Sequence, residues 1–396
     1  MNPVDDAPVL WSRARMLFER AIELPESERE AFLTQECAGD ARLRDELQSL
    51  LWADAAPAGV LDAPIESVTD ALAEAANGAL HRHGLPRSGV IGAWRIVSEL
   101  GAGGMGLVYL AERADGAYEQ RAALKIVRGG LFSGTLEQRF LRERQILARL
   151  QHPNIARLLD GGFTADGSPY LVMELVEGQP ITEWAERHRA ELDRRLRLFL
   201  QACEAVSFAH RQLVVHRDLK PSNILVDGRG HVRLLDFGIA QLLDENSGQG
   251  GLTRSDLMLL TPEFAAPEQI RGEPPTTATD VYGLGAVLYE LLSGKKAFAF
   301  ASSSIVDVLR AIEQEPPLLG GRKDLAPAVR RRLAGDLETI VRRAMSSEPD
   351  RRYPTVDALA ADIGRYLDGR PVLARGDGLG YRLVKYARRH RASVAA

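Results

Sequence analysis

The stretch that decides the fold is "VVHRDLKPSNILV", residues 214–226. It places an aspartate, a lysine and an asparagine (Asp218, Lys220 and Asn223) between two apolar runs. Phosphoryl transfer needs an acceptor for the proton of the incoming hydroxyl, a cation near the transferred phosphate and oxygen ligands for magnesium. These three side chains supply one of each. A polar surface turn could hold some of these residues, but a chance match at every position is negligible.

A second acidic residue follows in "LLDFGIAQ", residues 234–241. Asp236 stands between Leu235 and Phe237, so we expect it to be buried. A buried aspartate needs a partner, and Mg²⁺ is a natural one.

Upstream, "ELGAGGMGLVYLAE" (residues 99–112) places Gly101, Gly103 and Gly106 in G-x-G-x-x-G spacing. Such glycines let backbone amides approach phosphates, although they also occur in plain turns. A dinucleotide-binding loop is followed by a helix, whereas here residues 107–110 continue as a strand. The pattern therefore favours a glycine hairpin between two strands over nicotinamide binding, with a purely structural hairpin as the alternative.

Lys125 ends the segment "AALK" in an otherwise apolar strand. A lysine there is unfavourable unless it is paired or reaches a ligand. Glu143, in the helical segment "FLRERQIL", is a candidate partner. The alternative is that Glu143 is a solvated helix charge.

Taken together, H-R-D-x-K-x-x-N, D-F-G, the glycine hairpin and the strand lysine resemble the eukaryotic-type protein kinases, in particular the Ser/Thr class found in bacteria. The resemblance covers roughly residues 91–368. It implies an α+β, bilobal fold with a β-rich N-lobe and a helical C-lobe, and strands followed by helices in the sequence agree with it. A lysine two residues after the base is typical of Ser/Thr rather than tyrosine kinases.

The resemblance also implies roles for individual residues. Asp218 would be the catalytic base, with Lys220 near the γ-phosphate. Lys125 would hold the α- and β-phosphates of ATP and pair with Glu143. The metal ligands for Mg²⁺ (or Mn²⁺) would be Asn223 and Asp236.

The same resemblance implies an ATP site. The glycine loop would cover the phosphates, and Met173 would be the gatekeeper beside adenine. The adenine would lie between the apolar side chains of Leu100, Val108, Ala123 and Leu225. Its edge would meet backbone groups of Glu174 and Val176. The side chains of Leu147, Phe237 and His216 would stack as an apolar spine, which is also plain core packing.

Two structural assignments follow from the resemblance. Asp280 would accept hydrogen bonds from the backbone of the catalytic loop, and Arg352 would pair with Glu268. Neither is catalytic.

Residues 250–269, "GGLTRSDLMLLTPEFAAPEQ", would be the activation segment. Thr253 and Ser255 align with paired autophosphorylation sites, and a phosphate there could engage Arg217. Thr261 would be the substrate-pocket threonine that bridges Asp218 and Lys220. The family usually has glycine where this chain has Leu260, so the local backbone and substrate choice could differ.

The rest of the chain suggests four parts. Residues 5–56 read as a helical N-terminal unit, 57–90 as a linker, 91–368 as the kinase domain and 369–396 as a basic C-terminal segment. The N-terminal unit could be a solvated appendage, or it could dock on the kinase domain or self-associate.

Composition limits the function classes. The chain has 396 residues, a net charge of −4 and two distant cysteines, Cys37 and Cys203. We therefore expect no nucleic-acid partner, no disulfide framework and no zinc site, and a reducing compartment. The first residues, "MNPVDDAPVL", lack a secretory signal, and no run reaches the ~20 apolar residues of a membrane helix. A soluble, cytoplasmic chain is expected.

The C-terminus, "YRLVKYARRHRASVAA", carries five basic residues: Arg382, Lys385, Arg388, Arg389 and Arg391. Such a run is usually a solvated face, but it also flanks the cytoplasmic end of membrane helices and attracts anionic lipid. We hypothesise a receptor-like kinase tethered to the inner membrane beyond residue 396. An immediate stop codon after Ala396 would contradict this.

Expected partners are protein substrates and a second copy of the chain for trans-autophosphorylation. The competing hypothesis is a nucleotide-binding pseudokinase-like scaffold that signals by conformation. The complete set of Lys125, Asp218, Asn223 and Asp236 favours catalysis.

Overall fold

The computed structural model describes part of the chain: residues 32–33, 36–37, 89–103, 106–127, 134–237, 261–298, 300, 305–322, 326–376, 381 and 385. The chain divides into two compact units, Met1–Asp70 and Ala71–Ala396. In the first unit, Leu33 and Cys37 are buried, and the Cys37 N–H donates to the Leu33 carbonyl at 3.1 Å, as in a helical turn. This agrees with the helix predicted there. The boundaries predicted at residues 56 and 90 stay predictions.

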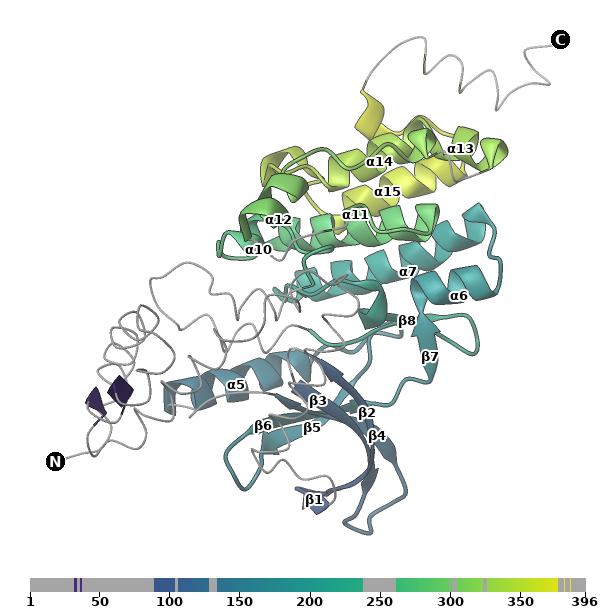
Figure 1. Cartoon of the computed structure of the whole chain (residues 1–396). Helices are drawn as coiled ribbons and strands as arrows, with labels where there is room; N and C mark the ends of the chain where they lie inside the picture. The colour runs from purple at the N-terminus through teal and green to yellow at the C-terminus, as the bar shows by residue number, and fades with distance from the viewer. Residues whose placement is uncertain are drawn as a thin grey trace. The chain divides into compact units, whose positions relative to one another are not determined.

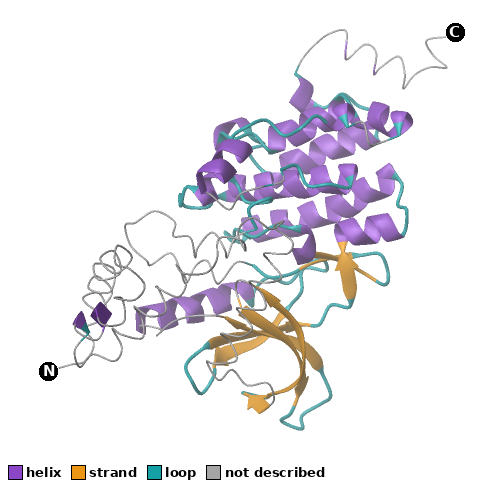
Figure 2. Cartoon of the chain, in the orientation of Figure 1, coloured by secondary structure: helices purple, strands orange, loops and turns teal. Residues whose placement is uncertain are grey.

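The second unit begins with a six-stranded antiparallel sheet and one helix (Figure 2). The strand order is β1-β2-β3-β4-β6-β5. The elements are β1 (Gly89–Ile91), β2 (Trp94–Gly103), β3 (Gly106–Arg113), β4 (Arg121–Val127), α5 (Gly134–Leu147), β5 (Leu158–Phe163) and β6 (Pro169–Glu174).

The sheet separates two apolar clusters because side chains alternate between its faces. Trp94, Leu124 and Val172 belong to the cluster on one face. On the other, Val127 and Leu171 pack with Phe140 of α5, which is fully buried. This second cluster reaches the helical lobe and therefore positions α5 beside the site described below.

A helical lobe follows (Figure 1), with a small sheet in the order β7-β8-β9. Helix α11 is its centre, since it packs against α6, α7, α14 and α15 and is buried along almost its whole length. The elements are β7 (Gly178–Pro180), α6 (Ile181–Arg187), α7 (Leu192–Arg211), β8 (Ile224–Asp227), β9 (Val232–Leu234), α10 (Pro267–Ile270), α11 (Thr277–Ser293), α12 (Ile305–Ile312), α13 (Pro327–Leu333), α14 (Asp336–Ala344) and α15 (Val356–Leu367), with short 3₁₀ turns at Pro221–Asn223, Leu319–Gly321, Pro349–Arg351 and Leu373–Arg375.

Capping residues explain why α11 begins and ends where it does. The Thr276 hydroxyl accepts from the N–H of Ala278, and Gly294 ends the helix with a φ of 72°. That left-handed conformation is open to glycine at little cost.

The α+β arrangement with a β-rich first lobe and a helical second lobe is confirmed. The three strands predicted around the glycines correspond to β2, β3 and β4. The short strand β1 and the three-stranded sheet of the helical lobe were not predicted, because strands of three or four residues carry little periodic signal. None of the helices in the described residues combines the length and apolarity that crossing a bilayer requires.

Candidate active site

The loop before β8 brings together the acid, the lysine and a hydroxyl. Lys220 Nζ lies 2.9 Å from Asp218 Oδ2 and donates to Thr261 Oγ1 at 3.1 Å. Asn223 Nδ2 donates to the Asp218 carbonyl at 2.8 Å and to its Oδ2 at 3.0 Å. Asp218 and Asn223 are buried, whereas Lys220 is partly exposed. The structure therefore gathers these four predicted residues, with Lys220 forming the link between Asp218 and Thr261.

Asp280, at the start of α11, holds the backbone of this loop. Its Oδ2 accepts the N–H of His216 at 2.8 Å, and its Oδ1 accepts the N–H of Arg217 at 2.9 Å. Arg217 has a φ of 70°, a sparsely populated conformation for a residue with a side chain. The buried carboxylate supports that strained backbone, and so it positions Asp218, the next residue. Its predicted role is confirmed by these contacts.

Two further residues support the loop and were missed by sequence reasoning. Gln269 Nε2 donates to the Arg217 carbonyl at 2.7 Å, and His210 Nε2 lies 2.7 Å from Asp280 Oδ2. The backbone of the loop is thus tied to α10 and α7 as well as α11. The local sequence around Gln269 and His210 has no pattern that signals these contacts.

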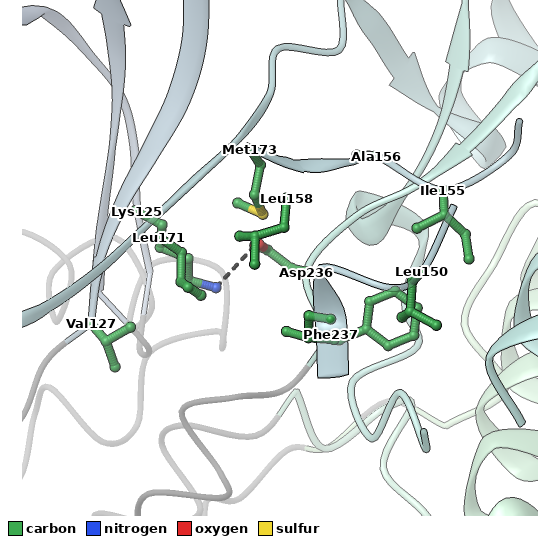
Figure 3. A pocket seen from close by; sticks show the side chains of 11 residues that line it. Lys125, Val127, Leu150, Ile155, Ala156, Leu158, Leu171, Met173, Asp236 and Phe237 are labelled. Carbon is green, nitrogen blue, oxygen red and sulfur yellow. Dashed lines mark hydrogen bonds and ion pairs between the residues drawn. The ribbon is translucent and has the colours of Figure 1, made fainter. Parts of the chain in front are cut away.

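Lys125 connects the two lobes. Its Nζ lies 2.9 Å from Asp236 Oδ2, and the two side chains are 12 % and 23 % exposed (Figure 3). Asp236 adopts a φ of 43°, and the preceding residue, Leu235, donates its N–H to the Asn223 carbonyl at 2.8 Å. The lysine in the apolar strand is therefore paired. Glu143 lies half-buried on α5, and its pairing with Lys125 stays a prediction.

The register of the sheet places the predicted nucleotide contacts on one face. Val108 is opposite Lys125, Ala123 is opposite Met173, and Ala123 and Lys125 are two residues apart. Directly opposed residues point to the same side of a sheet, as do residues i and i+2. Val108, Ala123, Lys125 and Met173 therefore face the same side, opposite to the buried Leu124.

The glycine segment is a hairpin, as predicted, with Gly103 paired to Gly106 at its end. Gly106 has a φ of 141°, and a Cβ there would lie 2.0 Å from the Ile126 carbonyl oxygen. At Gly101 a Cβ would meet no heavy atom within 4 Å. Gly106 is thus required by the fold, while Gly101 leaves open space beside the backbone.

Glu174 and Val176 lie where the chain passes from β6 to the helical lobe, and both are partly exposed. The Glu174 N–H donates to the Arg157 carbonyl at 2.9 Å, and the Glu174 carboxylate pairs with Arg233. Leu100 is 51 % exposed and Leu225 is partly buried, so both retain surface for a ligand.

A cavity of about 30 Å³ is lined by Met173 together with Lys125 and Asp236 (Figure 3). Leu158 and Leu171 line it on the sheet side and Phe237 on the other. The Phe237 ring lies 4.7 Å from that of His216, and Leu147 belongs to the same apolar cluster. Burial lowers the pKa of His216, which keeps the imidazole neutral, and its Nε2 lies 2.8 Å from the Leu235 carbonyl. The contacts of the predicted apolar spine are thus present.

Beyond the catalytic loop, Glu268 and Arg352 form a buried pair. Arg352 Nη1 and Nη2 donate to the two carboxylate oxygens at 2.6 and 2.7 Å. Thr279 Oγ1 donates to the same carboxylate, and the guanidinium lies over the ring of Tyr282. Burial opposes the charged form of Glu268, but the hydrogen bonds and charge of Arg352 outweigh it and lower the pKa. This predicted ion pair is confirmed.

Some expectations fall on residues outside the described ranges. Thr253, Ser255, Leu260 and Gly238 are among them. No cluster of three or more His, Cys, Asp or Glu side chains suited to a metal ion occurs within the described residues. The oxygen donors of Asn223 and Asp236 would instead share a cation with bound phosphates, as Mg²⁺ commonly does.

The comparison with protein families decides the membership of the chain. The family model for the protein kinase domain matches residues 94–362. The chain belongs to the protein kinase domain family. The region matched contains most of both lobes of the second unit and every residue of the site described above.

Three curated relatives that the chain resembles are bacterial kinases. The chain is 34 % identical over 276 residues to the serine/threonine-protein kinase pkn3 of Myxococcus xanthus, covering 68 % of this chain and 49 % of that protein. It is 34 % identical to PrkC of Bacillus subtilis (70 % and 41 % covered) and 32 % identical to PknB of Mycobacterium tuberculosis (69 % and 42 % covered). The chain thus spans about half the length, or less, of these relatives.

Among solved structures, the kinase domain of Mycobacterium tuberculosis PknI is similar, with a TM-score of 0.54 and 24 % sequence identity. The match covers 72 % of this chain and 100 % of that domain. At this identity the likeness concerns the fold, and it confirms the bilobal protein kinase fold.

Proposed function

We propose that the chain is a serine/threonine protein kinase that transfers the γ-phosphate of ATP to protein hydroxyls. The observation that carries the proposal is the triad of Asp218, Lys220 and Thr261, in which Lys220 Nζ contacts both other side chains at 2.9 and 3.1 Å. The three bacterial relatives are all named serine/threonine-protein kinases, which supports serine and threonine hydroxyls as the acceptors.

In this mechanism Asp218 accepts the proton of the serine or threonine hydroxyl. The bond between that oxygen and the γ-phosphorus forms as the bond to the bridging oxygen of ADP breaks. Lys220 neutralises charge on the transferred group and lies 2.9 Å from the carboxylate of Asp218. Asn223 orients Asp218 through the two hydrogen bonds donated by Nδ2.

The residues present fit ATP with Mg²⁺ or Mn²⁺. The side-chain nitrogen of Asn223 donates to Asp218, so the side-chain oxygen of Asn223 is left to bind a cation. Asp236, which pairs with Lys125, supplies a carboxylate for the same cation. When bound, the cation neutralises phosphate charge. Lys125 and the hairpin around Gly106 would hold the phosphates, and Met173, Val108 and Ala123 would face the adenine.

The test compares three forms of the 396-residue chain: wild type, Asp218→Asn and Lys125→Met. Each is incubated with γ-labelled ATP and Mg²⁺, with and without a generic basic protein substrate. Labelling by wild type alone, with phosphoserine or phosphothreonine in the product, is the expected result. Absence of labelling by a folded, nucleotide-binding wild type would contradict kinase activity and favour a pseudokinase-like scaffold.

The proposal extends to regulation. Thr253 and Ser255 are proposed sites of autophosphorylation, carried out in trans between two copies of the chain. The predicted membrane tether beyond residue 396 and the boundaries of the four parts remain part of the proposal. Sequencing downstream of Ala396 tests the tether, and limited proteolysis tests the boundaries.

A further inference from the structure

Residues 371–385, here called the C-terminal strap, follow the last residue of the family match, residue 362, and the end of α15. Of the strap, residues 371–376, 381 and 385 are described. The 3₁₀ turn Leu373–Arg375 packs against α14. The strap therefore returns to the helical lobe after α15 instead of leaving it.

The first anchor of the strap is Asp362 on α15, which is fully buried. Its Oδ1 accepts the N–H of Leu373 at 2.7 Å, and its Oδ2 accepts the N–H of Ala374 at 2.8 Å. Oδ2 also accepts the hydroxyl of Tyr353 at 2.9 Å. A buried carboxylate is stable only when such donors satisfy it, and here the strap backbone supplies two of them.

The second anchor is Asp336 at the start of α14, 6 % exposed. Lys385 Nζ lies 2.6 Å from its Oδ2, and Arg375 Nη1 lies 3.1 Å from its Oδ1. Lys385 is only 17 % exposed. Burial opposes ionisation of Asp336, but Lys385 and Arg375 outweigh it, and the pKa of the carboxyl is lowered.

Tyr381 completes this cluster. Its hydroxyl accepts the N–H of Val372 at 3.0 Å, and the Arg375 guanidinium lies 4.8 Å from its ring centre. Lys385 Nζ lies 5.9 Å from the same ring, one helical turn further along the chain. The strap is thus closed on itself as well as bound to α14 and α15.

We propose that the C-terminal strap is an integral part of the helical lobe, locked by Asp336 and Asp362, and that Lys385 is a structural cation of this lock. Sequence reasoning placed Lys385 in a basic run facing solvent or anionic lipid. In the structure, the ammonium group of Lys385 instead pairs with the buried carboxylate of Asp336. The chain is consequently held against α14 and α15 as far as Lys385, the last residue that the structure describes. This proposal does not depend on the proposed activity.

The test uses Lys385→Gln and Asp336→Asn in the 396-residue chain, with Arg370→Gln and Asp368→Asn as matched controls. Arg370 and Asp368 form a nearby ion pair, but their side chains are 49 % and 57 % exposed. Lys385→Gln is expected to lower the melting temperature by about 5–10 °C, because it removes the nearer of the two cations that pair with a buried carboxylate, while Arg370→Gln lowers it by about 2 °C at most. Tryptic cleavage after Arg375 should become faster in Lys385→Gln only.

A double-mutant cycle sharpens the result. Once Asp336→Asn is present, adding Lys385→Gln should change the melting temperature little, whereas the surface pair should show no coupling. If Asp336→Asn does not fold, the proposal is tested by comparing the melting temperatures and cleavage rates of Lys385→Gln and Arg370→Gln alone. Equal melting temperatures and cleavage rates for these two variants would overturn the proposal. So would loss of binding to phosphatidylglycerol vesicles by Lys385→Gln at an unchanged melting temperature.

Discussion

Lys125 Nζ lies 2.9 Å from Asp236 Oδ2, across 111 positions of the sequence. The contact joins β4 of the sheet to the segment after β9 in the helical lobe, and it is partly shielded from solvent. Both residues are proposed to contact ATP and its metal. The pair therefore holds the lysine proposed to bind phosphates next to the carboxylate proposed to bind the metal, at the junction of the lobes.

Replacing Lys125 is expected to lower phosphate transfer strongly. Lys125→Met should reduce kcat/KM at least about 100-fold, because it removes the cation for the phosphates and leaves Asp236 without its partner. Arg121→Met is the matched control on the same strand, since Arg121 is 65 % exposed and pairs with Glu112 at the surface. Steady-state kinetics with labelled ATP give kcat/KM for both variants. A Lys125→Met enzyme as active as Arg121→Met would exclude this role.

Asp218→Asn should reduce phosphate transfer by about 10²–10⁴-fold while the fold is retained. The amide cannot accept the proton, but it occupies the same volume next to Lys220 and Asn223. Kinetics give the rate and thermal unfolding gives the melting temperature. A large fall in both would indicate a structural role for Asp218 instead.

The glycine hairpin offers a pair of variants that differ only in position. Gly106→Ala should destabilise the protein by more than about 1 kcal/mol and weaken ATP binding, because its φ is 141° and its Cβ would meet the Ile126 carbonyl. Gly101→Ala has open space and should alter stability little. Denaturant unfolding and nucleotide titration measure the two effects. Equal behaviour of the two variants would contradict the close approach to Ile126.

The buried pair of Glu268 and Arg352 should contribute strongly to the stability of the helical lobe. Arg352→Met is expected to cost about 3–5 kcal/mol, because Glu268 is left charged and unpaired. The neighbouring Arg351, 73 % exposed, is the control, and Arg351→Met should stay within about 1 kcal/mol of wild type. Urea unfolding midpoints distinguish the two, and similar midpoints would refute the buried pair as a major contributor.

The lowered pKa of Glu268 predicts how this contribution depends on pH. In the unfolded chain Glu268 binds its proton at about pH 4.3, and in the folded chain it binds it at a lower pH. Between the two values the unfolded state holds more protons, so stability falls as the pH falls. The stability difference between wild type and Glu268→Gln should be full at neutral pH and shrink below about pH 4. A difference that does not change with pH would show that Glu268 has the same pKa in the folded and the unfolded chain.

Thr253→Ala combined with Ser255→Ala should lower activity and leave ATP binding largely intact, because phosphates there are expected to order the loop through Arg217. Mass spectrometry of the purified wild type should find both phosphates. Full activity of the double variant would show that the loop needs no phosphate. Thr261→Ala is a contrast within the same segment, since Thr261 already contacts Lys220 and should be required without phosphorylation.

Much of the site could be predicted from the sequence because its chemistry sits within short segments. Asp218, Lys220 and Asn223 lie within one loop, where side-chain type and spacing fix their neighbours. The hairpin was predictable because a strand, not a helix, follows Gly106. Conversely, the local sequence of Gln269 gives no sign that it supports the Arg217 carbonyl, since that contact depends on how α10 packs.

The sequence alone determined the class of fold and predicted the catalytic and metal-binding side chains. Through the resemblance to protein kinases it also predicted the buried partners Asp280, Glu268 and Arg352. Only the tertiary structure decided that Lys125 pairs with Asp236 and that Lys385 turns inward to Asp336. The physical reason is that charge pairing depends on distance in space and on exclusion of water. A lysine in a basic run reads as solvated until the fold brings a buried carboxylate to 2.6 Å from it.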